Sequence, residues 1–221
     1  MRNAIGSIKK VILISFAIGS NSYIGSCQEH QPPIPVEVLV GNEAVFSQLI
    51  LNLDFTPNSK FSLFSLTTYT AGYNKEEYEN DLVTINQITY DLGKGFGIMG
   101  GVNVNAAVGL TPVIGPEHVY VSRKFLAVSI FSYSVNGEHD ISFFGLYVFT
   151  PPINEKISLY SRLQVLYNQS LGERQHNRSF MYLRVGLKRN KFNFGFGTNL
   201  DQYGPDKDFT DNYGAFVGWD F

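Results

Sequence analysis

The last ten residues, Asn212-Tyr-Gly-Ala-Phe-Val-Gly-Trp-Asp-Phe221, decide the fold because they alternate in polarity up to the final aromatic. Every second residue is apolar or aromatic: Tyr213, Ala215, Val217, Trp219 and Phe221. The residues between them are mostly small or polar. Successive side chains of a β-strand point to opposite faces. This segment is therefore predicted to be a strand with one apolar face and one face suited to water.

The same period of two extends upstream to residue 36, and no amphipathic helix longer than a turn is visible. Between Phe96 and Val108, for example, an apolar series faces a series that includes Asn103 and Asn105. Many of these segments reach the roughly 9 to 11 residues of a tilted transmembrane strand. Twelve strands are predicted, near 36–40, 43–55, 61–73, 81–92, 96–108, 114–122, 125–135, 141–150, 157–169, 178–188, 192–200 and 212–221. Ten strands remain the alternative if 81–92 or 114–122 is not a strand.

Two kinds of connection alternate along the chain. Short ones lie near 56–60, 93–95, 123–124, 151–156 and 189–191, whereas longer, more charged ones lie near 74–80, 109–115, 136–140, 170–177 and 201–211. Phenylalanines stand beside the short connections, and tyrosines border the longer ones: Tyr73, Tyr133, Tyr167, Tyr203 and Tyr213. Two aromatic girdles at different membrane interfaces would give this division.

Together, the closing strand, the alternation and the two rims resemble small outer-membrane β-barrel proteins of gram-negative bacteria, with a porin-like architecture. The resemblance implies an all-β, antiparallel up-and-down transmembrane β-barrel that contacts outer-membrane lipid. It also implies insertion by the barrel-assembly machinery through recognition of the closing strand, with the assembly signal carried by Tyr213, Val217, Trp219 and Phe221.

The first residues have the order of a secretory signal. Arg2, Lys9 and Lys10 precede the apolar stretch 11–18, and small polar residues follow. Residues 1–27 are predicted to be a signal peptide, 28–35 a Pro-rich lead-in and 36–221 the barrel. The segment that ends at Cys27 is similar to a lipobox, so lipidation of Cys27 and plain cleavage beside it both stay open.

Composition excludes several classes of function. Charged residues make up 16% of the chain and the net charge is −2, which leaves no basic patch for nucleic acid. The single cysteine cannot form an intramolecular disulfide. Scattered histidines and one cysteine offer no metal-ligand spacing. We therefore expect no metal, no cofactor and no nucleic-acid partner.

Polar side chains on the predicted inner face are the candidate functional residues. They are Arg162, Arg184, Lys188, Gln164, Asn103, Asn105, Asn193 and Asp220, together with His118. A narrow pore lined by arginines and amides would pass small polar or anionic solutes without covalent chemistry. The alternative is that these cations pair with Asp54, Asp91 or Asp220 and fill the interior, which would make the protein a structural or adhesive barrel.

Enzymatic activity is the weakest of the three hypotheses. The chain has four histidines, His30, His118, His139 and His176, and no spacing compels any of them toward a nucleophile. The sequence therefore predicts a protein that is not an enzyme, with an outer-membrane hydrolase as the remaining alternative.

Overall fold

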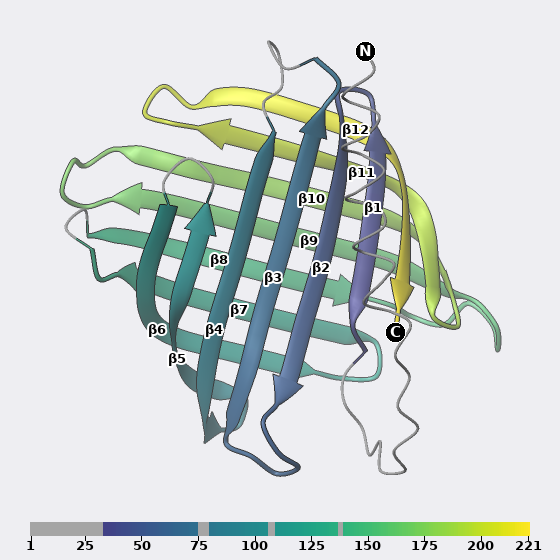
Figure 1. Cartoon of the computed structure of the whole chain (residues 1–221). Coiled ribbons are helices and arrows are strands. Elements are labelled where there is room, and N and C mark those ends of the chain that lie inside the picture. Colours follow the sequence, from purple (N-terminus) through teal and green to yellow (C-terminus); the bar gives the residue numbers. More distant parts are fainter. Residues whose placement is uncertain (1–32, 75–79, 106–108, 137–138) are drawn as a thin grey trace, which may run out of the picture. The chain divides into compact units, whose positions relative to one another are not determined.

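A computed structural model describes residues 33–74, 80–105, 109–136 and 139–221. Within these ranges the chain forms a closed antiparallel barrel of twelve strands (Figure 1), which confirms the predicted fold class and strand number. The strands are β1 (Pro35–Gly41), β2 (Ala44–Asp54), β3 (Phe61–Gly72), β4 (Asp81–Gly93), β5 (Phe96–Asn105), β6 (Gly109–Val121), β7 (Phe125–Ser134), β8 (Asp140–Phe149), β9 (Ser158–Ser170), β10 (His176–Arg189), β11 (Phe192–Tyr203) and β12 (Asp208–Asp220). In the same ranges, no helix is long and apolar enough to span a membrane. The predicted signal segment and Cys27 lie outside the described residues.

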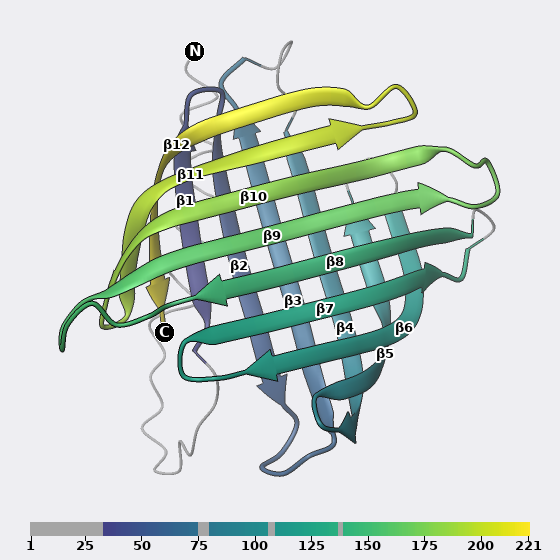
Figure 2. The ribbon, with the colours of Figure 1, turned by 180° about the vertical axis from the view of Figure 1, so that it is seen from behind.

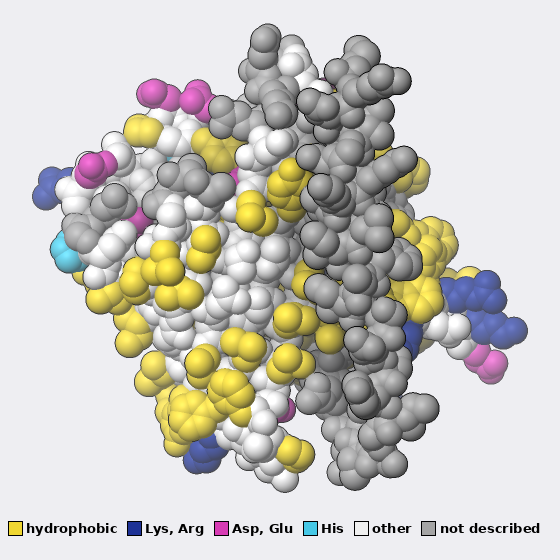
Figure 3. Space-filling model, viewed as in Figure 1, with side chains coloured by type: hydrophobic (Ala, Val, Ile, Leu, Met, Phe, Trp, Pro, Cys, Tyr) yellow, Lys and Arg dark blue, Asp and Glu magenta, His cyan; other side chains and the backbone are white. Residues whose placement is uncertain are grey.

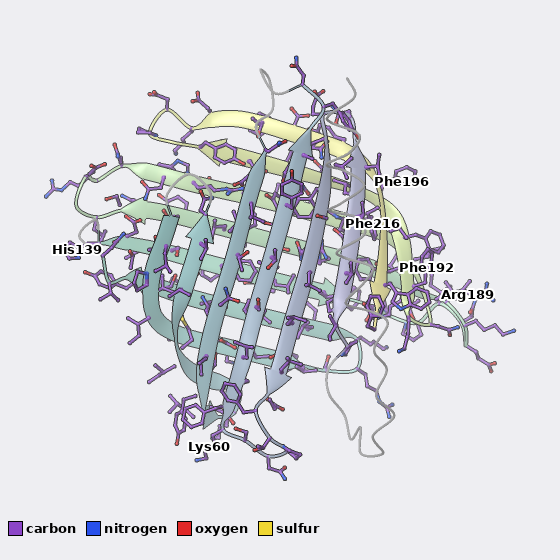
Figure 4. All side chains as sticks on the ribbon, viewed as in Figure 1. Lys60, His139, Arg189, Phe192, Phe196 and Phe216 are labelled. Atoms are coloured by element: carbon purple, nitrogen blue, oxygen red, sulfur yellow. The ribbon has the colours of Figure 1, made fainter. Side chains whose placement is uncertain are left out.

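The short strand β1 closes the ring. It pairs with β2 on one side and with β12 on the other, in a register that runs from Pro35 opposite Asp220 to Gly41 opposite Gly214. The start of β1 and the end of β12 therefore lie at the same rim of the barrel, which we call the terminal rim. The opposite rim is called the distal rim. Lys60 and His139 mark these two rims in Figure 4.

The predicted difference in connection length between the rims is wrong. The strand bounds leave connections of two to eight residues at either rim. Residues 109–115, which we expected to be a loop, begin β6, and β10, β11 and β12 extend into the expected loops 170–177 and 201–211. Ladder hydrogen bonds join backbone groups, so a strand continues where its side chains no longer alternate in polarity.

The outer wall of the barrel is apolar. Among the described residues, thirty-four large hydrophobic side chains are exposed and fifteen hydrophobic side chains are buried. Phe192 and Phe196 project from the wall in Figure 4, and Phe196 is 78% exposed. Figure 3 shows hydrophobic side chains spread over the wall and charged ones gathered toward its edges. This is the reverse of a water-soluble protein, in which contiguous exposed apolar surface is limited.

Side chains from opposite walls meet inside the barrel. The strands β2–β4 on one side cross those of β7–β10 on the other at a steep angle (Figures 1 and 2). The ring of Phe64 on β3 lies 6.4 Å from that of Phe144 on β8, within a buried apolar cluster. The members of this cluster are Ile50, Phe64, Leu66, Met99, Val113, Val128, Ile130, Phe144 and Leu146. One half of the interior is thus a hydrophobic core of the ordinary kind.

Candidate functional site

The other half of the interior is polar and follows β9 to β12 and β1. Arg162 on β9 lies directly opposite Arg184 on β10 in the ladder, and both side chains point inward. Lys188 lies further along β10 toward the terminal rim, and Arg178 lies toward the distal rim. We call the inward polar side chains of β9 to β12 and β1 the polar column. It extends from Lys188 near the terminal rim to Arg178 near the distal rim.

Glu37 on β1 is the centre of the polar column. Its Oε1 atom accepts hydrogen bonds from Arg162 Nη2 at 2.7 Å and from Arg184 Nε at 2.8 Å. All three side chains are nearly inaccessible, with residue exposures of 3% for Glu37, 4% for Arg162 and 0% for Arg184. One carboxylate therefore holds two guanidinium groups that would otherwise repel each other.

The side chain of Arg184 lies along the wall because a glycine gives it room. A Cβ atom at Gly197 on β11 would fall 2.5 Å from Arg184 Cδ. Arg184 Nη1 also donates to the carbonyl oxygens of Leu183 at 2.8 Å and Thr198 at 3.0 Å. Its guanidinium carbon lies 5.6 Å from the ring centroid of Phe46, a distance suited to a cation–π contact.

Ion pairs also occupy the two ends of the polar column. At the terminal rim, Lys188 Nζ lies 2.5 Å from Asp220 Oδ2. Toward the distal rim, Arg178 donates to Asp81 Oδ2 at 2.8 Å and to Asp201 Oδ1 at 3.0 Å. Asn105 joins this group because its Nδ2 atom donates to Asp81 Oδ1 at 3.3 Å.

The charges of these ion pairs cancel. Four basic side chains meet four acidic ones, since Glu37 serves two arginines and Arg178 serves two aspartates. A path for anions would need an excess of positive charge, and these pairs supply none. The polar column therefore acts electrostatically as a set of cross-links between distant strands.

Several buried polar atoms of the polar column have no hydrogen-bond partner among the described residues. Both amide atoms of Gln164, Nε of Arg162, Nη2 of Arg184 and Oδ1 of Asn193 belong to this group. Gln164 is fully buried. Buried polar groups in folded proteins are generally satisfied. These atoms could bind water or a small polar solute.

Most of the predicted inner-face residues point inward, but the predicted orientations of His118 and Tyr203 are wrong. Asn103, with a buried Oδ1 atom, lies inside on β5. His118 points outward, because it lies opposite Phe96 in the ladder and the side chains of opposite residues share a face. The ring centroids of His118 and the exposed Phe96 are 4.5 Å apart. Tyr203 points inward, where its hydroxyl accepts a hydrogen bond from Arg178, so it is not part of the predicted aromatic girdle.

The counterion of the two central arginines escaped sequence reasoning. Of the acidic partners predicted for the three cations, Asp220 pairs with Lys188, whereas Asp91 accepts a hydrogen bond from Gly93 N in a turn. Glu37 is the partner of Arg162 and Arg184. Its strand is short, and a glutamate among valines, Val36-Glu37-Val38, was the available signal.

Three residues of the predicted assembly signal, Tyr213, Val217 and Trp219, share the outer face of β12, and Phe221 follows directly after that strand. Tyr213, Val217, Trp219 and Phe221 have exposures of 42% to 61%. Trp219 and Phe221 have ring centroids 6.4 Å apart at the terminal rim. Their position is the one predicted for a lipid-facing strand, and their role in assembly stays a prediction.

Comparison with known proteins gives similarity of architecture at low sequence identity. No family model matches this chain, and no curated protein matches it. Among solved structures, the KdgM porin is similar with a TM-score of 0.48 at 10% identity, covering 86% of this chain and 99% of that one. LpxR from Salmonella typhimurium gives 0.45 at 9% identity, covering 86% and 100%. The COG4313 outer membrane channel from Pseudomonas putida F1 gives 0.43 at 10% identity, covering 89% and 98%.

Proposed function

We propose that this protein is an outer-membrane β-barrel whose interior is closed by its own side chains. It would act through its place in the envelope and through the surfaces of its wall and rims. The apolar outer wall supports the membrane location, because its exposed hydrophobic side chains would find their preferred surroundings in lipid. Barrel closure fits the same setting, since a closed sheet leaves no unpaired edge in hydrocarbon.

The observation that carries this proposal is contact across the interior. Phe64 meets Phe144 in the apolar half, and Glu37 meets both arginines in the polar half. Several large side chains of the interior have less than 2% of their surface exposed: Arg184, Gln164, Phe46, Leu39 and Met99. A side chain that lines an open aqueous pore would keep a larger accessible fraction.

A narrow channel for small polar or anionic solutes is the second candidate. It is favoured by the unpartnered polar atoms of Gln164, Arg162 and Arg184, which lie together along the polar column. Such a channel would follow the polar column and would require that the central ion pairs separate. Its selectivity would then depend on the arginines freed from Glu37.

Conductance in planar lipid bilayers separates the two candidates. Folding of the protein is checked by the heat-dependent shift of its band in gel electrophoresis. We expect no steady current from protein that passes this check. An open porin inserted under the same conditions provides the positive control. A steady current in the wild type would refute the closed interior, and a loss of anion preference in Lys188→Met would then assign the current to the polar column. Lys188 suits this test because its side chain is 30% exposed at the terminal rim.

A further inference from the structure

A serine and a histidine meet on the outer wall of β10, next to the distal rim. The ring Nε2 of His176 lies 3.0 Å from the hydroxyl oxygen of Ser179. Strand alternation alone would put these two side chains on opposite faces, because they are three residues apart. A register shift between His176 and Arg178 brings them to the same face. Bulges of this kind re-aim side chains and are over-represented beside active sites.

A backbone carbonyl fixes the proton on the histidine. Nδ1 of His176 lies 2.7 Å from the carbonyl oxygen of Gly204. A carbonyl oxygen only accepts hydrogen bonds, so Nδ1 must carry a proton. In the neutral ring, Nε2 then carries none and can accept the proton of Ser179. The pair thus has a nucleophile, a base and an orienting group within hydrogen-bond reach, as covalent catalysis by serine requires.

An apolar groove of about 260 Å³ begins at Ser179 on the outer wall. It is lined by Ser179, Phe180, Met181, Leu200, Gln202 and Phe209. In the ladder, Ser179 lies opposite Gln202, and Met181 lies opposite Leu200 one step further from the distal rim. Ser179 and Gln202 thus give the rim end of the groove two polar groups beside the ring of Phe209, which lies opposite Gln202, and Met181 and Leu200 make its other end apolar. An acyl chain that lies along the wall with its carbonyl group at Ser179 matches this order.

Two observations suit the chemistry of an ester bond at this depth. The ring of Tyr167, which is 44% exposed, lies 5.8 Å from that of His176, and tyrosines favour the interface between headgroups and hydrocarbon. Ester bonds of membrane lipids lie at the same interface. The hydroxyl of Ser179 donates a hydrogen bond to Oε1 of Gln202 at 3.2 Å; a half-turn of that amide would free the serine proton for His176 and would bring an amide N–H to this place, where it could stabilise a negatively charged oxygen.

We propose that Ser179 and His176 form a catalytic dyad that hydrolyses an acyl ester of a lipid in the leaflet next to the distal rim. The Oγ atom of Ser179 attacks the ester carbonyl carbon while its proton moves to His176 Nε2. The ester C–O bond then breaks, and the leaving alcohol takes the proton from His176. A water molecule, deprotonated by His176, then attacks the carbonyl carbon of the acyl-serine; the acyl–Oγ bond breaks, the proton returns from His176 to Ser179 Oγ, and a fatty acid is released. This activity is independent of whether the barrel interior conducts.

Covalent labelling tests the nucleophile directly. The folded protein in phospholipid vesicles is treated with a fluorophosphonate probe, and the labelled peptide is identified by mass spectrometry. We expect the label on Ser179 in the wild type, and none in Ser179→Ala. Ser161→Ala is the matched control, because Ser161 also lies on the outer face, on the adjacent strand opposite Val185, and it should leave labelling unchanged.

Hydrolysis of a p-nitrophenyl ester of a medium-chain fatty acid tests the base. We expect His176→Gln to lower the rate about 10²- to 10⁴-fold, the usual contribution of a general base. The glutamine amide can still donate to Gly204 O, so this variant should remain folded where an alanine variant could fail. If the folded wild type neither accepts the label at Ser179 nor hydrolyses the ester faster than Ser179→Ala, the contact is only a brace for the bulge and the proposal is overturned.

Discussion

Replacing Glu37 by glutamine should destabilise the barrel strongly. The substitution keeps the shape of the side chain but removes the one negative charge between Arg162 and Arg184. Two guanidinium groups, 4% and 0% exposed, would then remain buried with no counterion. Breaking a buried ion pair by removing one partner costs about 3–5 kcal/mol. We expect a loss of this size in the free energy of unfolding.

The measurement is equilibrium unfolding of the folded protein by guanidinium chloride in detergent or lipid, followed by tryptophan fluorescence. Trp219 is the only tryptophan of the chain. Glu43→Gln is the control, because the carboxylate of Glu43 accepts a hydrogen bond from Asn42 at an exposed position. A surface change of that kind should stay within about 0.5 kcal/mol.

Replacing all three members of the cluster by apolar residues of similar volume should cost less than Glu37→Gln alone. Buried ion pairs can be exchanged for hydrophobic residues with little loss, because the desolvation penalty disappears with the charges. The predicted role of Glu37 is refuted if the free energy of unfolding of Glu37→Gln lies within about 1 kcal/mol of that of the wild type. It is equally refuted if the triple apolar variant is the less stable of the two.

Three further predictions concern packing and assembly. Gly186→Ala should destabilise the barrel by about 1–3 kcal/mol, because a Cβ there would lie 2.0 Å from a backbone oxygen of β11. Gly100→Ala is the control, since the nearest atom to its Cβ would be 4.0 Å away, and it should be tolerated in the same unfolding assay. Phe64→Ala should cost about 3–5 kcal/mol by opening a cavity opposite Phe144, and denaturant titration against the wild type measures it. Deletion of Phe221 should reduce the heat-modifiable form recovered from outer membranes, and full recovery would contradict an assembly role for this residue.

The fold was largely readable from the sequence because lipid and water impose opposite polarity on the two faces of each strand. The alternation read from Trp219 on β12 and from Phe221 after it correctly placed Arg162, Arg184 and Lys188 inside. It failed at His118, where the alternation in β6 is interrupted by Pro112 and Pro116 and gives no reliable phase. Extension of the strands beyond the apolar wall was also invisible, because backbone pairing there needs no alternating pattern.

The contacts that define the candidate sites depend on closure and on one register shift, and neither leaves a periodic signal. Glu37 lies 125 residues from Arg162 in the chain, and no local pattern links them. His176 falls within the connection predicted near 170–177, but it is the first residue of β10. The register shift between His176 and Arg178 then decides whether it faces Ser179.

The position of Glu37 has a consequence for the kinetics of folding and unfolding. The carboxylate is on β1 and its arginines are on β9 and β10, so these bonds can form only after β1 has paired with β12. Long-range pairings of this kind form late and slow the folding reaction. Interactions that are absent from the transition state act mainly on the rate of unfolding. The ion pairs of Glu37 with Arg162 and Arg184 would therefore form after the barrel has closed. They would lower the rate of unfolding more than they would raise the rate of folding.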